Sequence, residues 1–166
     1  MTPRHRLLSI LATLGLVTSA LTGTLTAAAA PAPPPAAASG VIRVASVYGV
    51  DETVRRLKAD IDTKGIKFFA ETDQSALAAG TDLKVGRSVL LQFGNPPLGL
   101  QFLTASPYAG LDWPVRMLVF EDSDKHVWVA YTDFAYIAKR HAITTRDAQF
   151  HMASEVAASI AASVQK

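Results

Sequence analysis

The sequence predicts one α+β domain, a two-layer α/β structure in which helices pack on a mixed, mostly five-stranded sheet. Short β-branched segments alternate with segments of helical periodicity in the first half, and two apolar segments flank a short polar loop in the second half. The expected order is β-α-β-α-β-α-β-β-α plus a C-terminal helix. The 166 residues fit a single domain, which we place at residues 41–143.

The first two strands are predicted over residues 41–47 and 66–72, with a helix between them. The first strand, VIRVASV, is short and rich in β-branched residues. The helix covers residues 52–64, where apolar side chains recur at helical spacing. Gly65 follows this helix, and glycine commonly ends helices because it tolerates positive φ.

A third strand is predicted over residues 87–93, with a short helix on each side. Asp73 can cap a helix over residues 74–79. After the strand, Asn95 can cap a further helix, and Pro96 suits the first helical position because its ring already fixes φ. That helix is expected to have one or two turns.

The second half is predicted to contain a β-hairpin and two helices. Strands over residues 115–121 and 126–132 flank a polar four-residue loop, which is typical of an antiparallel hairpin. A helix follows over residues 133–141. Residues 144–166 repeat an apolar side chain every four residues and are predicted to form an amphipathic helix. This last helix is expected at the domain edge or against a partner subunit.

The N-terminal forty residues resemble an export signal followed by a linker. Residues 1–30 combine a positively charged start, an apolar run and an alanine-rich cleavage region. The alternative is an uncleaved membrane helix, because the apolar run reaches that length, although serine and threonine weaken it. Residues 31–40, PAPPPAAASG, form a Pro/Ala-rich linker. We expect an exported protein, periplasmic or extracellular, with no stable membrane anchor after cleavage.

Charge and cysteine content exclude several classes of function. The chain has 16 basic and 14 acidic residues, but Arg4 and Arg6 lie in the predicted signal, so the mature chain has 14 of each. Nucleic-acid binding relies on an excess of Lys and Arg, so we expect no nucleic-acid partner. The absence of cysteine excludes disulfides, thiol catalysis and thiolate metal ligands.

Several short motifs lie in a fixed order between residue 41 and about residue 140. They are Thr53-Val54-x-x-Leu57, Lys64-Gly65-Ile66, FGNPPLG at 93–99, LDWPVR at 111–116, Glu121-Asp122 and VWVAYTD at 127–133. In this order they resemble the domain-of-unknown-function 302 family. The resemblance implies a small α/β domain that self-associates, and it implies no established activity. Where that family often shows Asp-His, this chain has Asp73-Gln74, so a metal or haem role loses support.

Four polar residues at or just beyond predicted strand ends are the candidates for a ligand site. They are Asp73, Asn95, Asp112 and Arg116. Loops at the ends of α/β sheets are where ligands usually bind, and an arginine fork can hold a carboxylate or phosphate. The structural alternative is that Asp73 and Asn95 are helix caps and that Arg116 pairs with Asp112 inside the protein.

Two aromatic residues are weaker candidates. Tyr131 lies on the same strand face as Val127 and Val129, so core packing competes with a hydrogen bond to a ligand. Trp113 precedes a proline and could line a pocket or anchor a dimer contact, where tryptophan is favoured.

The histidines do not have the spacing of a metal site, so we predict no metal and no cofactor. His126, His141 and His151 include no His-x-x-x-His pair, and the sequence has no Gly-x-Ser-x-Gly elbow. The first hypothesis is therefore an exported, non-catalytic binding or accessory module for a small polar or anionic ligand. The second is a homodimeric structural or interaction protein. The third, less favoured, is an enzyme with an Asp/His acid–base pair.

Overall fold

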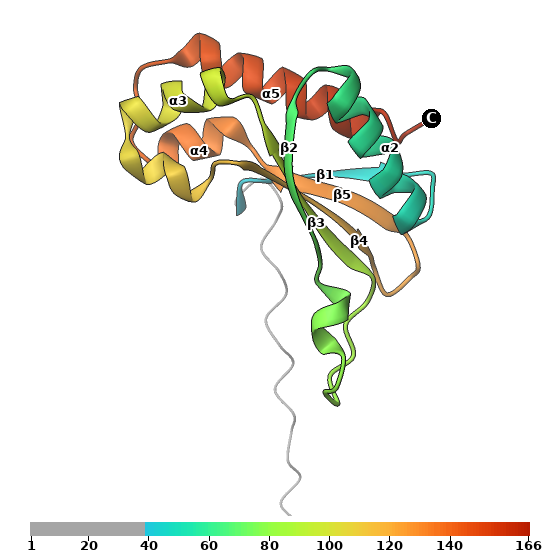
Figure 1. Ribbon diagram of the computed structural model, residues 1–166. Coiled ribbons are helices and arrows are strands. Elements are labelled where there is room, and N and C mark those ends of the chain that lie inside the picture. The colour runs from blue at the N-terminus through green and yellow to red at the C-terminus, as the bar shows by residue number, and fades with distance from the viewer. Residues whose placement is uncertain (1–38) are drawn as a thin grey trace, which may run out of the picture. The chain divides into compact units, whose positions relative to one another are not determined.

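A computed structural model describes residues 39–166 as one α+β domain (Figure 1). This confirms the predicted fold class. The predicted signal, residues 1–30, and most of the predicted linker lie outside the described residues. Within the described part of the chain, no helix combines the length and the apolar character that crossing a bilayer requires.

The sheet has five strands in the order β1-β5-β4-β3-β2. They are β1 (Val41–Ser46), β2 (Lys67–Asp73), β3 (Ser88–Gly94), β4 (Val115–Glu121) and β5 (Val127–Thr132). Every neighbouring pair is antiparallel, whereas the sequence predicted a mixed sheet. The reason is the crossover after β1. Strands β1 and β2 run in the same direction, but they occupy opposite edges of the sheet and so never pair.

Helices connect the strands close to the predicted positions. In residues 39–166 they are α2 (Val50–Thr63), α3 (Pro96–Ala105), α4 (Phe134–Arg140), α5 (Asp147–Ala162) and the 3-10 turns η1 (Ser75–Ala78) and η2 (Pro107–Leu111). The helix expected at 74–79 is only the turn η1. Figure 1 shows α2 and α5 on the same side of the sheet.

The hydrophobic core lies between the sheet and its layer of helices. Alternate residues of the central strands point into it, because successive side chains of a strand face opposite ways. Leu91, Met117 and Val129 are completely buried there. Helix α2 contributes Leu57 and Ile61, which are also completely buried.

The C-terminal helix α5 belongs to the same core. Its buried face includes Ala153, Ala157 and Ala161, whose short side chains let the helix lie close to its neighbours. Past its end, the backbone N–H of Val47 donates to the carbonyl of Val164 at 3.0 Å. The alanine-rich stripe therefore packs against this domain itself.

The opposite face of the sheet carries two rows of apolar side chains, which are partly exposed except for the buried Ala130. In the first row Leu90 lies across from Leu118, and Leu118 lies across from Ala130. In the second row Phe120 lies across from Trp128. These side chains alternate along their strands with the fully buried core residues, so they face away from the helices.

Candidate ligand cavity

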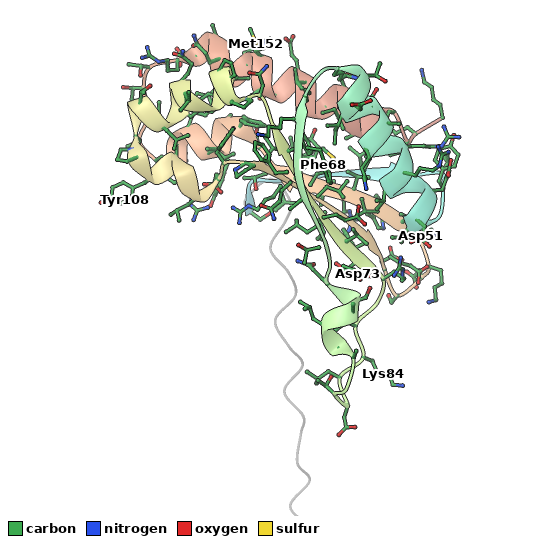
Figure 2. The ribbon with its side chains drawn as sticks, in the orientation of Figure 1. Asp51, Phe68, Asp73, Lys84, Tyr108 and Met152 are labelled. Carbon is green, nitrogen blue, oxygen red and sulfur yellow. The ribbon has the colours of Figure 1, made fainter. Side chains whose placement is uncertain are left out.

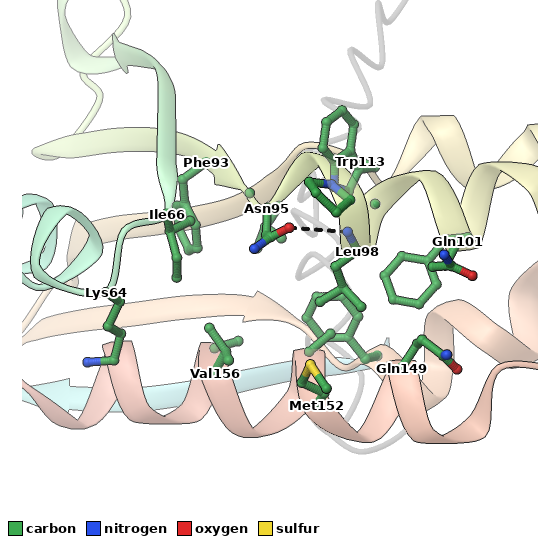
Figure 3. A pocket seen from close by; sticks show the side chains of 18 residues that line it. Lys64, Ile66, Phe93, Asn95, Leu98, Gln101, Trp113, Gln149, Met152 and Val156 are labelled. Carbon is green, nitrogen blue, oxygen red and sulfur yellow. Dashed lines mark hydrogen bonds between the residues drawn. The ribbon is translucent and has the colours of Figure 1, made fainter.

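A cavity of about 620 Å³ opens between α3, α5 and the neighbouring ends of β3 and β4 (Figure 3). Its apolar lining includes Ile66, Phe93, Leu98, Phe102, Trp113, Val115, Phe134, Met152, Ala153 and Val156. Small-molecule sites are typically concave, mostly apolar and of about 300–1,000 Å³. In size and lining this cavity has the properties of a ligand site.

The sequence FGNPPLG builds one wall of the cavity. After β3, the Asn95 side-chain oxygen accepts a hydrogen bond from the backbone N–H of Leu98 at 3.2 Å, which caps α3. A Cβ atom at Gly99 would overlap the indole of Trp113, so the helix can pass this close to the ring only with glycine there. Trp113 in turn makes an edge-to-face contact with Phe69, with ring centroids 5.6 Å apart.

Polar lining groups lie at both ends of the cavity, and Asn95 lies between them. Figure 3 shows Lys64 at one end and Gln101 and Gln149 at the other. The Asn95 oxygen faces Leu98, and its amide nitrogen points the other way. Among the described residues that line the cavity, Lys64 is the only one with a titratable side chain.

Asp73 lies at the other end of the sheet from Asn95. In the antiparallel β2–β3 pair, Asp73 is opposite Val89 near the start of β3, whereas Asn95 follows the end of that strand. Figure 2 shows Asp73 where β2 leads into η1, well away from Met152 on α5. The structure therefore does not bring Asp73 and Asn95 together.

Local partners account for the position of Asp73. It accepts hydrogen bonds from the Ser75 hydroxyl and from the backbone N–H of Ala76, and it pairs with Arg87 at 3.1 Å. The Ser75 hydrogen bond is the main cause that lowers the pKa of Asp73, with the Ala76 N–H and the charge of Arg87 adding to it. Asp73 thus stabilises the start of η1 from the position before its N-cap residue, Gln74.

Asp112 and Arg116 do meet, in a cluster of charged residues. The Asp112 side chain is only 3% exposed, and its carboxylate accepts from Arg116 Nη2 at 3.1 Å and from Arg140 Nη1 at 3.2 Å. His141 Nε2 lies 2.6 Å from the other carboxylate oxygen. Arg140 and His141 were not among the predicted site residues, although both lie at the end of a predicted helix.

Tyr131 is buried on the helix side of the sheet, as its strand face predicts. It is 5% exposed, and burial raises the pKa of its hydroxyl, with the charge of Asp133 adding to the effect. Arg116 points to the opposite face, because it alternates with the buried Met117. The five predicted site residues thus do not share one cavity: among them only Asn95 lines the cavity beside α3.

Three potential metal ligands lie together in the hairpin loop of the described chain. They are Asp122, Asp124 and His126. One oxygen of Asp122 accepts from the backbone N–H of Asp124 and of His126, and the other accepts from Trp128 Nε1 at 2.7 Å. These hydrogen bonds stabilise the β4–β5 turn, and they account for the proximity of the three side chains.

The residues that line the cavity were mostly missed by sequence reasoning. Leu98, Phe102, Met152 and Val156 are apolar residues on predicted helices, and such a pattern also describes a core. Asn95 and Trp113 were the exceptions: Asn95 was a predicted ligand-site residue, and the place of Trp113 beside a proline suggested a pocket or a contact. Only the packing of α3 and α5 leaves a space between them.

Comparison with known proteins identifies relatives along most of the chain. A family model described as "Domain of unknown function DUF302" matches residues 42–166. Two relatives are named fluoride-specific ion channel FluC 1, from Brucella suis biovar 1 (strain 1330) and Brucella abortus biovar 1 (strain 9-941). Each is 34% identical over 105 residues, which is 63% of this chain and 41% or 39% of the relative. The chain thus spans about two fifths of the length of these proteins.

One solved structure has the same fold. It is the crystal structure of an uncharacterized conserved protein DUF302 from Bacillus stearothermophilus, with a TM-score of 0.64 and 15% sequence identity. The match covers 76% of this chain and 98% of that one. At this identity the likeness concerns the arrangement of strands and helices.

Proposed function

We propose that this chain, which belongs to the DUF302 family of domains of unknown function, is an exported, non-catalytic binding module whose ligand occupies the cavity beside α3. The observation that carries the proposal is the cavity itself, with a volume of about 620 Å³ and an apolar lining. A space of this kind, bordered by a few polar groups, is the usual form of a small-molecule site.

The chemistry of the lining favours binding over catalysis. General acid–base catalysis needs a titratable group within hydrogen-bond reach of the reacting atoms. Of the described residues that line the cavity, only Lys64 can titrate, and its ammonium is paired with Asp60 at 2.5 Å. The pair that could serve as acid and base, Asp112 and His141, is not part of the lining.

An anion site at Arg116 is less well supported than the cavity. Arg116 Nη2 donates hydrogen bonds to the Leu111 carbonyl and to the Asp112 carboxylate, and these bonds hold the guanidinium in place. The hollow beside Asp112 and Arg116 has a volume of only about 10 Å³. An anion at this place would have to bind on the outer surface of the cluster, where water competes.

An accessory role agrees with the relatives. In the two Brucella proteins named as ion channels, the matching region accounts for about two fifths of the chain. A region that makes up only part of a larger chain is suited to an auxiliary task. We therefore propose that the module serves another process by holding a ligand.

Dye binding tests the proposal. N-phenyl-1-naphthylamine, a neutral dye that fluoresces in apolar surroundings, is expected to bind the purified protein. Ala153 lines the cavity and Ala158 lies on the exposed face of the same helix. Ala153→Phe should fill the space and weaken dye binding at least about tenfold, whereas Ala158→Phe should bind like the wild type. Equal binding by both variants would place the dye elsewhere and contradict the proposal.

Export is tested on the protein made by its native host. The protein is recovered from the periplasm or the medium, and its N-terminus is determined by mass spectrometry. We expect a first residue between positions 27 and 31, which means that the signal has been removed. An intact Met1 on protein from the cytoplasm would contradict export.

A homodimer through the open sheet face is a second candidate, favoured by the apolar rows of that face. Leu118 lies in the middle of the first row, between Leu90 and Ala130. Stable interfaces bury about 800 Å² on each partner around an apolar centre. Leu118→Lys should therefore turn a dimer into a monomer in sedimentation equilibrium, whereas Thr81→Lys on the exposed β2–β3 connection should not. A wild-type monomer at micromolar concentration would exclude the dimer.

A further inference from the structure

We infer that the ligand of the cavity beside α3 is a neutral, mostly apolar molecule, and not the anion that the sequence suggested. This inference rests on the proposed function, because it specifies the ligand of the same site. It follows from which charges the lining offers, from which hydrogen-bonding groups remain, and from the shape of the apolar middle.

The first step is the charge of the lining. Lys64 is its only charged member in the described chain, and the Lys64 ammonium is 2.5 Å from the Asp60 carboxylate. Figure 3 shows the ammonium pointing away from Asn95 and the other labelled lining residues. The positive charge of Lys64 is thus already neutralised by Asp60, which lies one helical turn earlier in the chain. An anion entering the cavity would lose its hydration without gaining an opposite charge.

The second step is the set of neutral polar groups. Asn95 uses its oxygen as the cap of α3, so its amide nitrogen remains as a donor near the middle of the cavity. Gln101 and Gln149 offer further amides at the end opposite Lys64. Side-chain amides form hydrogen bonds without charge, so they suit hydroxyl, carbonyl or amide groups of a neutral ligand.

The third step is the apolar body. Leu98 and Val156 face the same space from α3 and α5, and Trp113 closes it from above in the view of Figure 3. Met152 lies on α5 and is 54% exposed, so an unbranched, adaptable side chain stands at the border between cavity and solvent. Burial of apolar ligand surface is the favourable interaction that this lining can supply.

Two dyes with the same ring system test the inference. N-phenyl-1-naphthylamine is neutral, and 1-anilinonaphthalene-8-sulfonate is the same molecule with an anionic sulfonate. Both are titrated against the purified full chain, against Ala153→Phe and against Ala158→Phe. We expect the neutral dye to bind at least about tenfold more tightly than the sulfonate and only its binding to depend strongly on Ala153.

Two variants at the rim make the test specific. Asp60→Asn removes the partner of Lys64 and leaves an unpaired ammonium at the cavity, so the affinity for the sulfonate should rise severalfold and that for the neutral dye should stay. Lys64→Met is the matched control and should leave both affinities close to those of the wild type. Both substitutions are at partly exposed side chains, 30% for Lys64 and 22% for Asp60, so folding is preserved.

The outcomes separate the inference from the proposed function. If neither dye responds to Ala153→Phe, the cavity is not a binding site and both fail. If Ala153→Phe weakens both dyes equally and the sulfonate binds as tightly as the neutral dye, the cavity remains a site and its preference for neutral ligands is overturned. A neutral preference that becomes severalfold smaller in Asp60→Asn, but not in Lys64→Met, supports both.

Discussion

At the residue scale, Asp112 is the carboxylate with the most basic partners among the described residues, namely Arg116, Arg140 and His141. It is buried, and it joins the loop before β4 to Arg116 on that strand and to Arg140 and His141 at the end of α4. Hydrogen bonds to charged groups contribute about 1.5–3 kcal/mol each. The two arginines are almost half exposed, 48% and 46%, so water would partly replace the lost carboxylate.

We therefore predict that Asp112→Asn lowers the free energy of unfolding by about 2–3 kcal/mol. The expected loss arises because His141, 5% exposed, would remain buried without its anionic partner. Arg116→Ala should cost less than about 1 kcal/mol, as is usual for half-exposed ion pairs. Urea denaturation measures both values. A loss for Arg116→Ala as large as that for Asp112→Asn would show that the arginine, and not the carboxylate, organises the cluster.

For the predicted site residues, local roles could be predicted from the sequence, but their positions relative to one another could not. The capping role considered as an alternative is correct for Asn95, because a cap depends only on neighbours in the sequence. Asp73 instead accepts from the backbone N–H of Ala76 and lies one position before the N-cap of η1, Gln74. The expected convergence of Asp73 and Asn95 depended on strand direction. Because β2 and β3 are antiparallel, the C-terminal end of β2 lies beside the N-terminal end of β3. Asp73 at the end of β2 and Asn95 after the end of β3 are therefore separated by the length of a strand.

At the element scale, the caps of α3 and α4 offer a matched pair. Asn95 accepts from Leu98 N–H at 3.2 Å, and Asp133 accepts from Ala135 N–H at 3.0 Å. Asn95→Ala and Asp133→Ala should each lower the free energy of unfolding by about 1 kcal/mol.

The two variants should differ in ligand binding, because the first turn of α3 contributes Pro97, Leu98 and Gly99 to the cavity wall, whereas α4 contributes only Phe134. Asn95→Ala is expected to weaken N-phenyl-1-naphthylamine binding, since it loosens the turn that holds Leu98 and removes the amide donor. Asp133→Ala should weaken binding much less. Equal effects of both variants on the dye would mean that global stability, and not the local wall, controls binding. Thermal melting and dye titration on the same samples measure the two properties.

Most elements were predictable from local pattern, but their arrangement was not. The hairpin of β4 and β5 and the helices α2 and α4 lie where periodicity and turn residues placed them. The C-terminal helix was predicted to be amphipathic and to lie at the domain edge or against a partner subunit. Much of its apolar face consists of alanine. In the structure Ala157 and Ala161 are buried, since short side chains allow close packing. The sequence pattern predicts which face of a helix is apolar, but it does not predict which neighbouring element covers that face.

At the scale of the whole described domain, residues 39–166, one layer of helices covers one face of the sheet, and no helix of these residues covers the other face. The same arrangement accounts for both candidate functions. Helices α3 and α5 meet beside the ends of β3 and β4 and leave the cavity between them, while the uncovered face carries the apolar rows around Leu118. A ligand site and a dimer surface can therefore coexist on opposite sides of the sheet.

The stability of the whole domain should depend on pH in two separate ranges. Hydrogen bonds from Arg55 lower the pKa of Glu52 from 4.5 to about 2, and the Trp128 indole N–H lowers the pKa of Asp122 from its ordinary 3.8. A lowered pKa in the folded state stabilises it above the unfolded pKa, and that stabilisation is lost as the pH falls. Tyr131 has the opposite sign: burial raises its pKa above 10.0, so its stabilisation is lost as the pH rises.

We accordingly predict a plateau of melting temperature between about pH 5 and pH 9, with a decline on each side. Asp122→Asn should make the acid limb shallower and leave the alkaline limb unchanged, because the loop carboxylate titrates only at low pH. Tyr131→Phe should do the reverse, since a ring without a hydroxyl has no proton to lose. Melting curves recorded by circular dichroism from pH 2 to 11 distinguish the limbs. If Tyr131→Phe left the alkaline limb as steep as in the wild type, the buried phenol could not be its cause, and the lysines would have to be tested in its place.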